Sequence, residues 1–218
     1  MKKILIFIFS ILLFSCKKEK NSNSFHFKGK VNGQDINWLA PILEPGSNLQ
    51  PQFQTGALTQ AGVGGPLNGP CYTGDLDYQL HEGSEIYESH SGNSSDFSNS
   101  IAVYFARSEK RPFAPKSEMQ SWFTNGTKSF GLLRRNCSDP VVDGIVISYT
   151  DVNNKSWNSS WGDQSSNAFE QVSLIDGTTN ALWYTKKWTV RFSCKLYDEN
   201  GNFIELKDCK LYGPVFPL

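Results

Sequence analysis

Apolar and polar residues alternate along much of this chain, and the alternation predicts β-strands. Apolar side chains occupy every second position over most of residues 25–31 and throughout residues 188–196. A period of two is typical of a strand with one buried face, and no segment keeps the helical period for three turns. The apolar residues 101–106 and the alternating residues 145–149 predict two further strands. We therefore expect an all-β fold.

Turn-forming residues separate these predicted strands. Asn32–Gly33 follows the first strand, and Asn125–Gly126 predicts a hairpin between the apolar residues 122–123 and 130–133. An Asn-Gly pair is the strongest short-range signal for a hairpin. Residues 198–202 predict another turn, after the longest strand. Short strands joined by such turns favour a single antiparallel β-sandwich, with a partly open β-barrel as the alternative.

Residues 41–100 differ from the rest because proline and glycine recur throughout them and serine is frequent in residues 89–100. Proline and glycine interrupt regular structure, and a serine-rich stretch is typical of an exposed loop. We therefore predict one domain over residues 25–218 that carries a loop-rich insertion at about residues 41–100.

The first residues have the layout of a secretory signal. Two lysines precede an apolar run from Ile4 to Phe14, and residues 17–24 are polar. A helix of that length is too short to cross a hydrocarbon core of about 30 Å. We predict that residues 1–15 are a signal peptide and that residues 16–24 form a flexible tether. Its eight residues after position 16 could extend roughly 28 Å.

Leu13-Phe14-Ser15-Cys16 resembles the lipobox of bacterial lipoproteins. The resemblance implies cleavage before Cys16, a diacylglyceryl group on its sulfur and a fatty acid, typically palmitate, on its amine. Two or three chains hold a protein firmly at a membrane, whereas one chain does not. No aspartate follows Cys16, which by the enterobacterial sorting rule implies the outer membrane, on its periplasmic or its surface face. The alternative is an ordinary signal peptide that is cut somewhat later.

Four further segments, residues 27–33, 147–151, 157–164 and 192–197, resemble the pattern of small uncharacterised lipoproteins of Bacteroidota-type envelopes. The resemblance implies an all-β domain in a bacterial cell envelope and no established activity.

Charge and cysteine content narrow the function classes. Basic and acidic residues number 21 each, so the chain lacks the basic excess of nucleic-acid-binding proteins. Outside the cytoplasm, disulfides are expected. Register disfavours the pairing of Cys194 with Cys209, because the hairpin places Leu206 or Lys207 opposite Cys194. Free thiols are the alternative. The disulfide candidates are Cys71, Cys137, Cys194 and Cys209.

No catalytic or metal-binding motif is complete. The chain has no C-x-x-C pair for zinc, no G-x-S-x-G and no phosphate-binding loop. We expect no metal and no cofactor, and we favour a protein that is not an enzyme. A carboxylate-dependent polysaccharide hydrolase is the alternative. Spacing selects no pair among the acidic residues that could serve it, which are Asp75, Asp77, Glu82, Glu85 and Glu88.

Trp157 and Trp161 lie among asparagine, serine, glycine and aspartate residues. Exposed indoles beside hydrogen-bonding side chains can stack on sugar rings. The alternative is a pair of cross-strand aromatics that covers one end of the sandwich. We therefore predict a membrane-anchored envelope lipoprotein that acts as a binding or interaction module, with a glycan as the first ligand to test. A structural partner of an outer-membrane protein complex is a further alternative.

Overall fold

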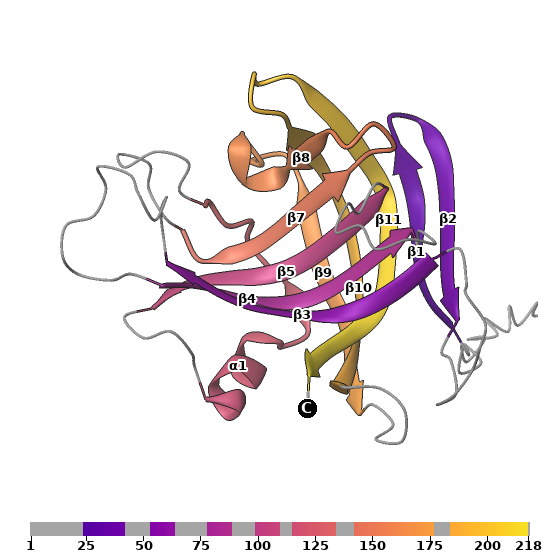
Figure 1. Cartoon of the computed structure of the whole chain (residues 1–218). Coiled ribbons are helices and arrows are strands. Elements are labelled where there is room, and N and C mark those ends of the chain that lie inside the picture. Colours follow the sequence, from indigo (N-terminus) through magenta and orange to yellow (C-terminus); the bar gives the residue numbers. More distant parts are fainter. Residues whose placement is uncertain are drawn as a thin grey trace, which may run out of the picture.

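The computed structural model describes residues 24–41, 53–63, 78–88, 99–109, 115–133, 142–176 and 184–217, and strands form most of this part (Figure 1). In chain order the elements are β1 (Ser24–Val31), β2 (Gln34–Pro41), β3 (Phe53–Val63), β4 (Tyr78–Glu88), β5 (Ser100–Glu109), α1 (Lys116–Trp122), β6 (Gly126–Thr127), β7 (Gly144–Thr150), β8 (Ser156–Asn158), the 3-10 helix η1 (Ser159–Trp161), β9 (Ala168–Asp176), β10 (Tyr184–Tyr197) and β11 (Phe203–Pro217). No helix in the described ranges is long and apolar enough to cross a bilayer.

All of these strands belong to one antiparallel sheet. Its order is β2-β1-β11-β10-β8-β7-β5-β4-β3, and β9 branches from β10 to pair with β6. The sheet curls on itself, so that β3, β4, β5 and β7 run across β9, β10 and β11 (Figure 1). β3, at one end of the order, comes close to β11 and to β2, at the other end. The all-β prediction is confirmed, and a curled single sheet is nearer to the partly open barrel than to two separate sheets.

Two of the predicted turns form where the sequence places them. Asn32 and Gly33 both have positive φ, at 51° and 82°, as a tight turn between right-twisted strands requires. Between β10 and β11, the Asp198 carboxylate accepts hydrogen bonds from the backbone N–H groups of Asn200 and Asn202, at 3.0 and 2.8 Å. Local hydrogen bonding of this kind fixes the turn and therefore the register of the two longest strands.

The predicted alternation in β10 is confirmed, because its apolar positions from Trp188 to Leu196 are at most 3 % exposed. They meet aromatic side chains of β1, β2 and β9 inside the curled sheet. Phe192 stacks with Phe169, with 6.0 Å between ring centroids, and Phe27 lies 5.4 Å from Trp38. Each such buried side chain contributes roughly 1.5–3 kcal/mol to folding. This apolar interior is the main source of stability.

β4 and β11 approach closely on the inside of the curl. A Cβ atom at Gly213 would lie 2.6 Å from Ser84 Oγ, so only glycine fits there. The Ser84 hydroxyl donates a hydrogen bond to the Pro214 carbonyl and accepts one from Trp188 Nε1 at 2.6 Å. A single buried hydroxyl therefore joins β4, β10 and β11.

α1 and the residue after it cover one end of the curled sheet (Figure 1). The Phe123 ring meets the edge of Trp188, with centroids 4.9 Å apart, and Trp122 packs 5.6 Å from Phe105. The Arg107 guanidinium covers the Trp122 ring at 5.2 Å. The hairpin predicted at Asn125–Gly126 is wrong, because burial of the two preceding aromatic residues turns the chain into a helix and leads β6 to pair with β9.

The predicted loop-rich insertion contains two long strands. β3 and β4 lie within residues 41–100 and pair over their whole length, from Phe53 opposite Glu88 to Val63 opposite Tyr78. β5 then pairs with the other edge of β4. Continuous pairing on both sides of β4 overrides the weak local preference of a glycine-containing segment. The rest of the predicted insertion lies outside the described residues.

Candidate functional site

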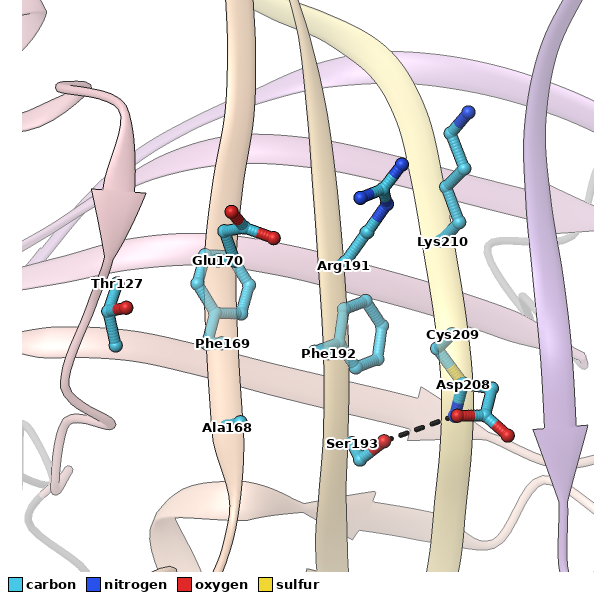
Figure 2. Close-up of a pocket in the computed structure, with 10 residues that line it drawn as sticks. All are labelled: Thr127, Ala168, Phe169, Glu170, Arg191, Phe192, Ser193, Asp208, Cys209 and Lys210. Atoms are coloured by element: carbon cyan, nitrogen blue, oxygen red, sulfur yellow. Dashed lines mark hydrogen bonds between the residues drawn. The ribbon is translucent and has the colours of Figure 1, made fainter. Parts of the chain in front are cut away.

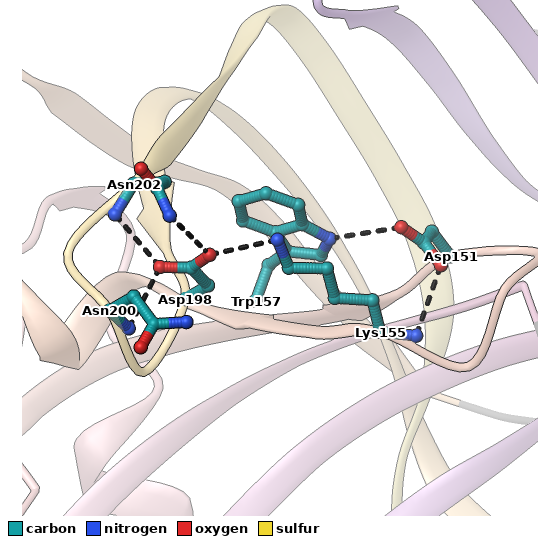
Figure 3. A network of polar contacts seen from close by, with 6 residues as sticks. All are labelled: Asp151, Lys155, Trp157, Asp198, Asn200 and Asn202. Carbon is teal, nitrogen blue, oxygen red and sulfur yellow. Dashed lines mark hydrogen bonds and ion pairs between the residues drawn. The ribbon is translucent and has the colours of Figure 1, made fainter.

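Trp157 is not the exposed platform that its polar neighbours suggested. Its side chain is only 8 % exposed. The indole Nε1 donates to Asp151 Oδ2 at 3.2 Å, and Lys155 Nζ lies over the ring, 4.1 Å from its centroid (Figure 3). That prediction of exposure is wrong because the surrounding polar residues enclose the indole and leave no free face for a ligand.

The same cluster contains an ion pair between an exposed lysine and a buried aspartate. Lys155 Nζ lies 2.8 Å from Asp198 Oδ2, whose side chain is 1 % exposed. The ion pair and the hydrogen bonds from Asn200 and Asn202 hold the pKa of Asp198 well below its usual range (Figure 3). These contacts connect the turn after β7 to the turn after β10. We assign the cluster a structural role.

Trp161 ends η1 and is half-buried. Asn158 caps this helix by accepting a hydrogen bond from the Ser160 N–H at 2.8 Å. Gln164 Nε2 then donates to the carbonyls of Ser159 and Lys195, at 2.8 and 2.7 Å. The polar residues around Trp161 thus fix the path of the chain, which explains their number without a ligand.

Cys194 and Cys209 are buried free thiols, so the described structure contains no disulfide between them. Cys194 lies opposite Leu206, which is one of the two predicted registers. Cys209 lies opposite Phe192, because Asp208, with a φ of 52°, forms a bulge in β11. Burial raises the pKa of both thiols, that of Cys209 to about 12. Cys16, Cys71 and Cys137 lie outside the described residues.

Three of the candidate acids lie in β4, and no two of them face each other closely. Glu82 is fully buried inside the curled sheet, whereas Glu85 lies on the other face of β4. Glu88 shares the inner face with Glu82 but is six residues away, about 20 Å along the strand. Glycosidase carboxylates stand roughly 5–10 Å apart. Asp75 and Asp77 lie outside the described residues.

His81 packs against Tyr104 on the outer face of β4 and β5, with ring centroids 4.7 Å apart. Burial lowers the pKa of His81 to about 4 and raises that of Tyr104 to about 12, and Asn158 and Ser148 hydrogen-bond the Tyr104 hydroxyl. Both groups are therefore neutral near pH 7, and neither is poised for proton transfer. Nowhere in the described ranges do three acidic, histidine or cysteine side chains gather to hold a metal ion.

A groove of about 570 Å³ opens on the outer face of β9, β10 and β11. Phe169, Phe192 and Cys209 point inward and are buried, so the side chains that alternate with them face the groove. Figure 2 shows Glu170, Arg191 and Lys210 in one row on the three neighbouring strands. The lining residues are Thr127, Ala168, Phe169, Glu170, Arg191, Phe192, Ser193, Asp208, Cys209 and Lys210.

Strand register extends this row and adds an aromatic row beside it. Arg191 lies opposite Glu170 on one side and Lys210 on the other, and Lys210 lies opposite Lys28 of β1. Two residues further along the same face, Tyr212 lies opposite His26, with ring centroids 5.7 Å apart. The face therefore combines cations, a carboxylate and half-buried aromatic rings, which are the groups that commonly hold polar organic ligands.

The sequence alone does not predict this face because its members come from four strands. Arg191 and Lys28 are 163 positions apart, and each belongs to an ordinary alternating pattern. Only the register of β1, β11 and β10, with its bulges, brings them together. The signal present in the sequence was the polar half of the β10 alternation, which carries no information about neighbouring strands.

In comparisons with known proteins, the chain matches no protein-family model, no curated protein and no solved structure. Its function is therefore inferred from the chemistry of the groove and the N-terminal sequence.

Proposed function

We propose that this chain is a lipid-anchored lipoprotein of a bacterial envelope and that its β domain is a binding module. The groove on β9, β10 and β11 is its ligand site, and a glycan is the ligand class. The observation that supports the proposal most directly is the groove itself, an open hollow of about 570 Å³ with charged and polar side chains at its rim.

The groove suits sugar hydroxyl groups. The Arg191 guanidinium and the Lys210 ammonium donate hydrogen bonds, and the carboxylates of Glu170 and Asp208 accept them. The rings of Tyr212 and His26 lie on the same face and can contact the apolar side of a sugar ring. Rigid strands carry all of these groups, so binding costs little ordering of the protein. The groove replaces Trp157 and Trp161 as the proposed site.

A glycan array with the full chain in a non-ionic detergent tests the ligand class. The comparison needs three variants, Arg191→Gln and Tyr212→Ala in the proposed site and Trp161→Ala in the earlier candidate. We expect the first two to lose the glycans that the unmodified chain retains, and Trp161→Ala to keep them. A chain that retains no glycan, or a loss confined to Trp161→Ala, contradicts the proposed site.

The anchor has its own test. Cells that express the full chain and are fed labelled palmitate should incorporate the label into this protein, and Cys16→Ser should remove it. Label that persists in Cys16→Ser, or no label on the unmodified chain, contradicts the lipidation of Cys16. This result is independent of ligand binding, because the residues that line the groove belong to β6, β9, β10 and β11.

A further inference from the structure

The charges on the outer face of the sheet mostly follow a complementary pattern. Most cations there have an acid directly opposite on a neighbouring strand, as in Lys30 with Asp35, Lys195 with Glu205 and Lys186 with Asp176. Cross-strand pairs of opposite charge stabilise a sheet, and directly opposed like charges destabilise it. The fold alone therefore accounts for this complementary pattern.

Lys210 breaks the pattern, because it lies between two other cations. Arg191 is directly opposite on β10, and Lys28 is directly opposite on β1. Neighbouring strands are about 4.8 Å apart, so three positive charges arise from a row about 10 Å long. Glu170 at the β9 end of the row is the nearest acid in register. The row thus keeps a net positive charge that weakens the sheet.

Within the described part of the chain, the side chains of Arg191 and Lys28 form no hydrogen bond or ion pair. Arg191 does not reach Glu170 although the two residues are opposite, and both cations are exposed. The adjacent row also places two cations opposite each other, Lys30 and Lys207. Both have an acid nearby, since Lys30 lies opposite Asp35 on its other side and Lys207 pairs with Glu205 at 2.6 Å. Arg191 and Lys28, which form no such contact, therefore lie on either side of Lys210, and we call these three residues the cationic row.

We propose that the cationic row binds a phosphate group, carried on the saccharide that occupies the groove. A guanidinium fork binds two oxygens of a phosphate at once, and ammonium groups at neighbouring positions neutralise its second charge. Tyr212 and His26 lie two residues further along the same strands, about 7 Å from the row, so a sugar ring attached to the phosphate can reach them. The inference rests on the proposed function, to which it adds the charge of the ligand.

Calorimetric titration of the full chain in a non-ionic detergent tests the inference, with glucose, glucose 1-phosphate and inorganic phosphate as the probes. We expect glucose 1-phosphate to bind at least about tenfold more tightly than glucose, and Arg191→Gln to weaken it about fivefold. The matched control is Lys186→Gln, which removes one charge from the same strand but from a cation already paired with Asp176. It should leave the affinity unchanged.

The outcomes separate the inference from the proposed function. Equal affinity for glucose and glucose 1-phosphate, or equal weakening in Lys186→Gln, overturns the phosphate site and leaves the glycan module in place. If none of the three probes binds, both the phosphate site and the glycan-binding module are overturned. A further arm adds phosphatidylglycerol to the detergent micelles. If the unmodified chain releases or absorbs heat on binding these micelles and Arg191→Gln does not, the phosphate site is supported. A lipid headgroup is then the source of the phosphate.

The urea midpoint of the free chain is a second measurement that distinguishes a binding role of the row from a purely structural one. Lys28→Gln removes one like charge from the row, so the urea midpoint of the free chain should stay the same or rise while glucose 1-phosphate binding weakens. Added salt should likewise weaken that binding, because the charges are exposed and screened. A Lys28→Gln chain that unfolds at lower urea concentration contradicts the reading of the row as a site of repulsion relieved by a ligand.

Discussion

The Ser84 hydroxyl is the most informative position for a test of the fold, because one buried group joins three strands. It donates to the Pro214 carbonyl and accepts from Trp188 Nε1, and both Ser84 and Trp188 are fully buried. Ser84→Ala leaves a carbonyl and an indole N–H without partners. A buried polar group that loses its partner costs about 1–3 kcal/mol. We therefore expect a loss of about 2–4 kcal/mol of unfolding free energy.

Urea unfolding followed by tryptophan fluorescence measures this loss. Ser166→Ala is the matched control, because Ser166 is exposed, and it should change stability by less than about 0.5 kcal/mol. A double variant with Trp188→Phe removes the donor and the acceptor together. The two changes should then cost about 1 kcal/mol less than the sum of the single changes. If Ser84→Ala unfolds at the same urea concentration as the control, the hydroxyl does not hold β4 against β11, and the closure of the sheet is misassigned.

Three further outcomes follow from the buried groups. Gly83→Ala should lower stability by about 1–3 kcal/mol in urea unfolding, because its Cβ would overlap the Val103 carbonyl oxygen and the Tyr104 Cα; an unchanged midpoint argues against the close packing of β4 on β5. His81 has its pKa lowered by burial to about 4, so its contribution to stability is complete above about pH 6.5 and is lost as the pH falls toward 4. His81→Gln should flatten the fall of the urea midpoint between pH 7 and 4.5, and an identical fall in both chains refutes the assignment. Cys194 and Cys209 should resist a maleimide at pH 8 in the folded chain and react in urea, as mapped by peptide mass spectrometry; rapid labelling of either thiol in the folded chain contradicts its burial.

Local sequence signals predicted the parts of the fold that are locally determined. β10 and its turn into β11 were predicted because alternation and an Asx-type turn act within a few residues. α1 was missed because it depends on Trp122 and Phe123 reaching the interior, where they meet Phe105 and Trp188 from distant strands. The pairing of β3 with β4 likewise depends on β5, which supplies the other neighbour of β4.

The candidate site was harder to predict, for two physical reasons. Polar residues around an indole predict a ligand site only if they are free to bind one. Here Asp151 accepts a hydrogen bond from Trp157, and Lys155 forms an ion pair with Asp198. A cationic side chain at an exposed position of one strand does not predict a binding site. Only the register of the sheet places such side chains from different strands opposite one another. The bulges at Gly29 and Asp208 set that register, and a bulge leaves no clear signal in a single sequence.

An NMR chemical-shift map of the full chain, titrated with glucose 1-phosphate in a non-ionic detergent, tests the central claim most directly. The account expects shifts in the backbone amides of β1, β10 and β11 around Lys28, Arg191 and Lys210, with β4 and β5 unchanged. Shifts confined to the segment from Trp157 to Trp161, or no shift in any strand, would contradict it.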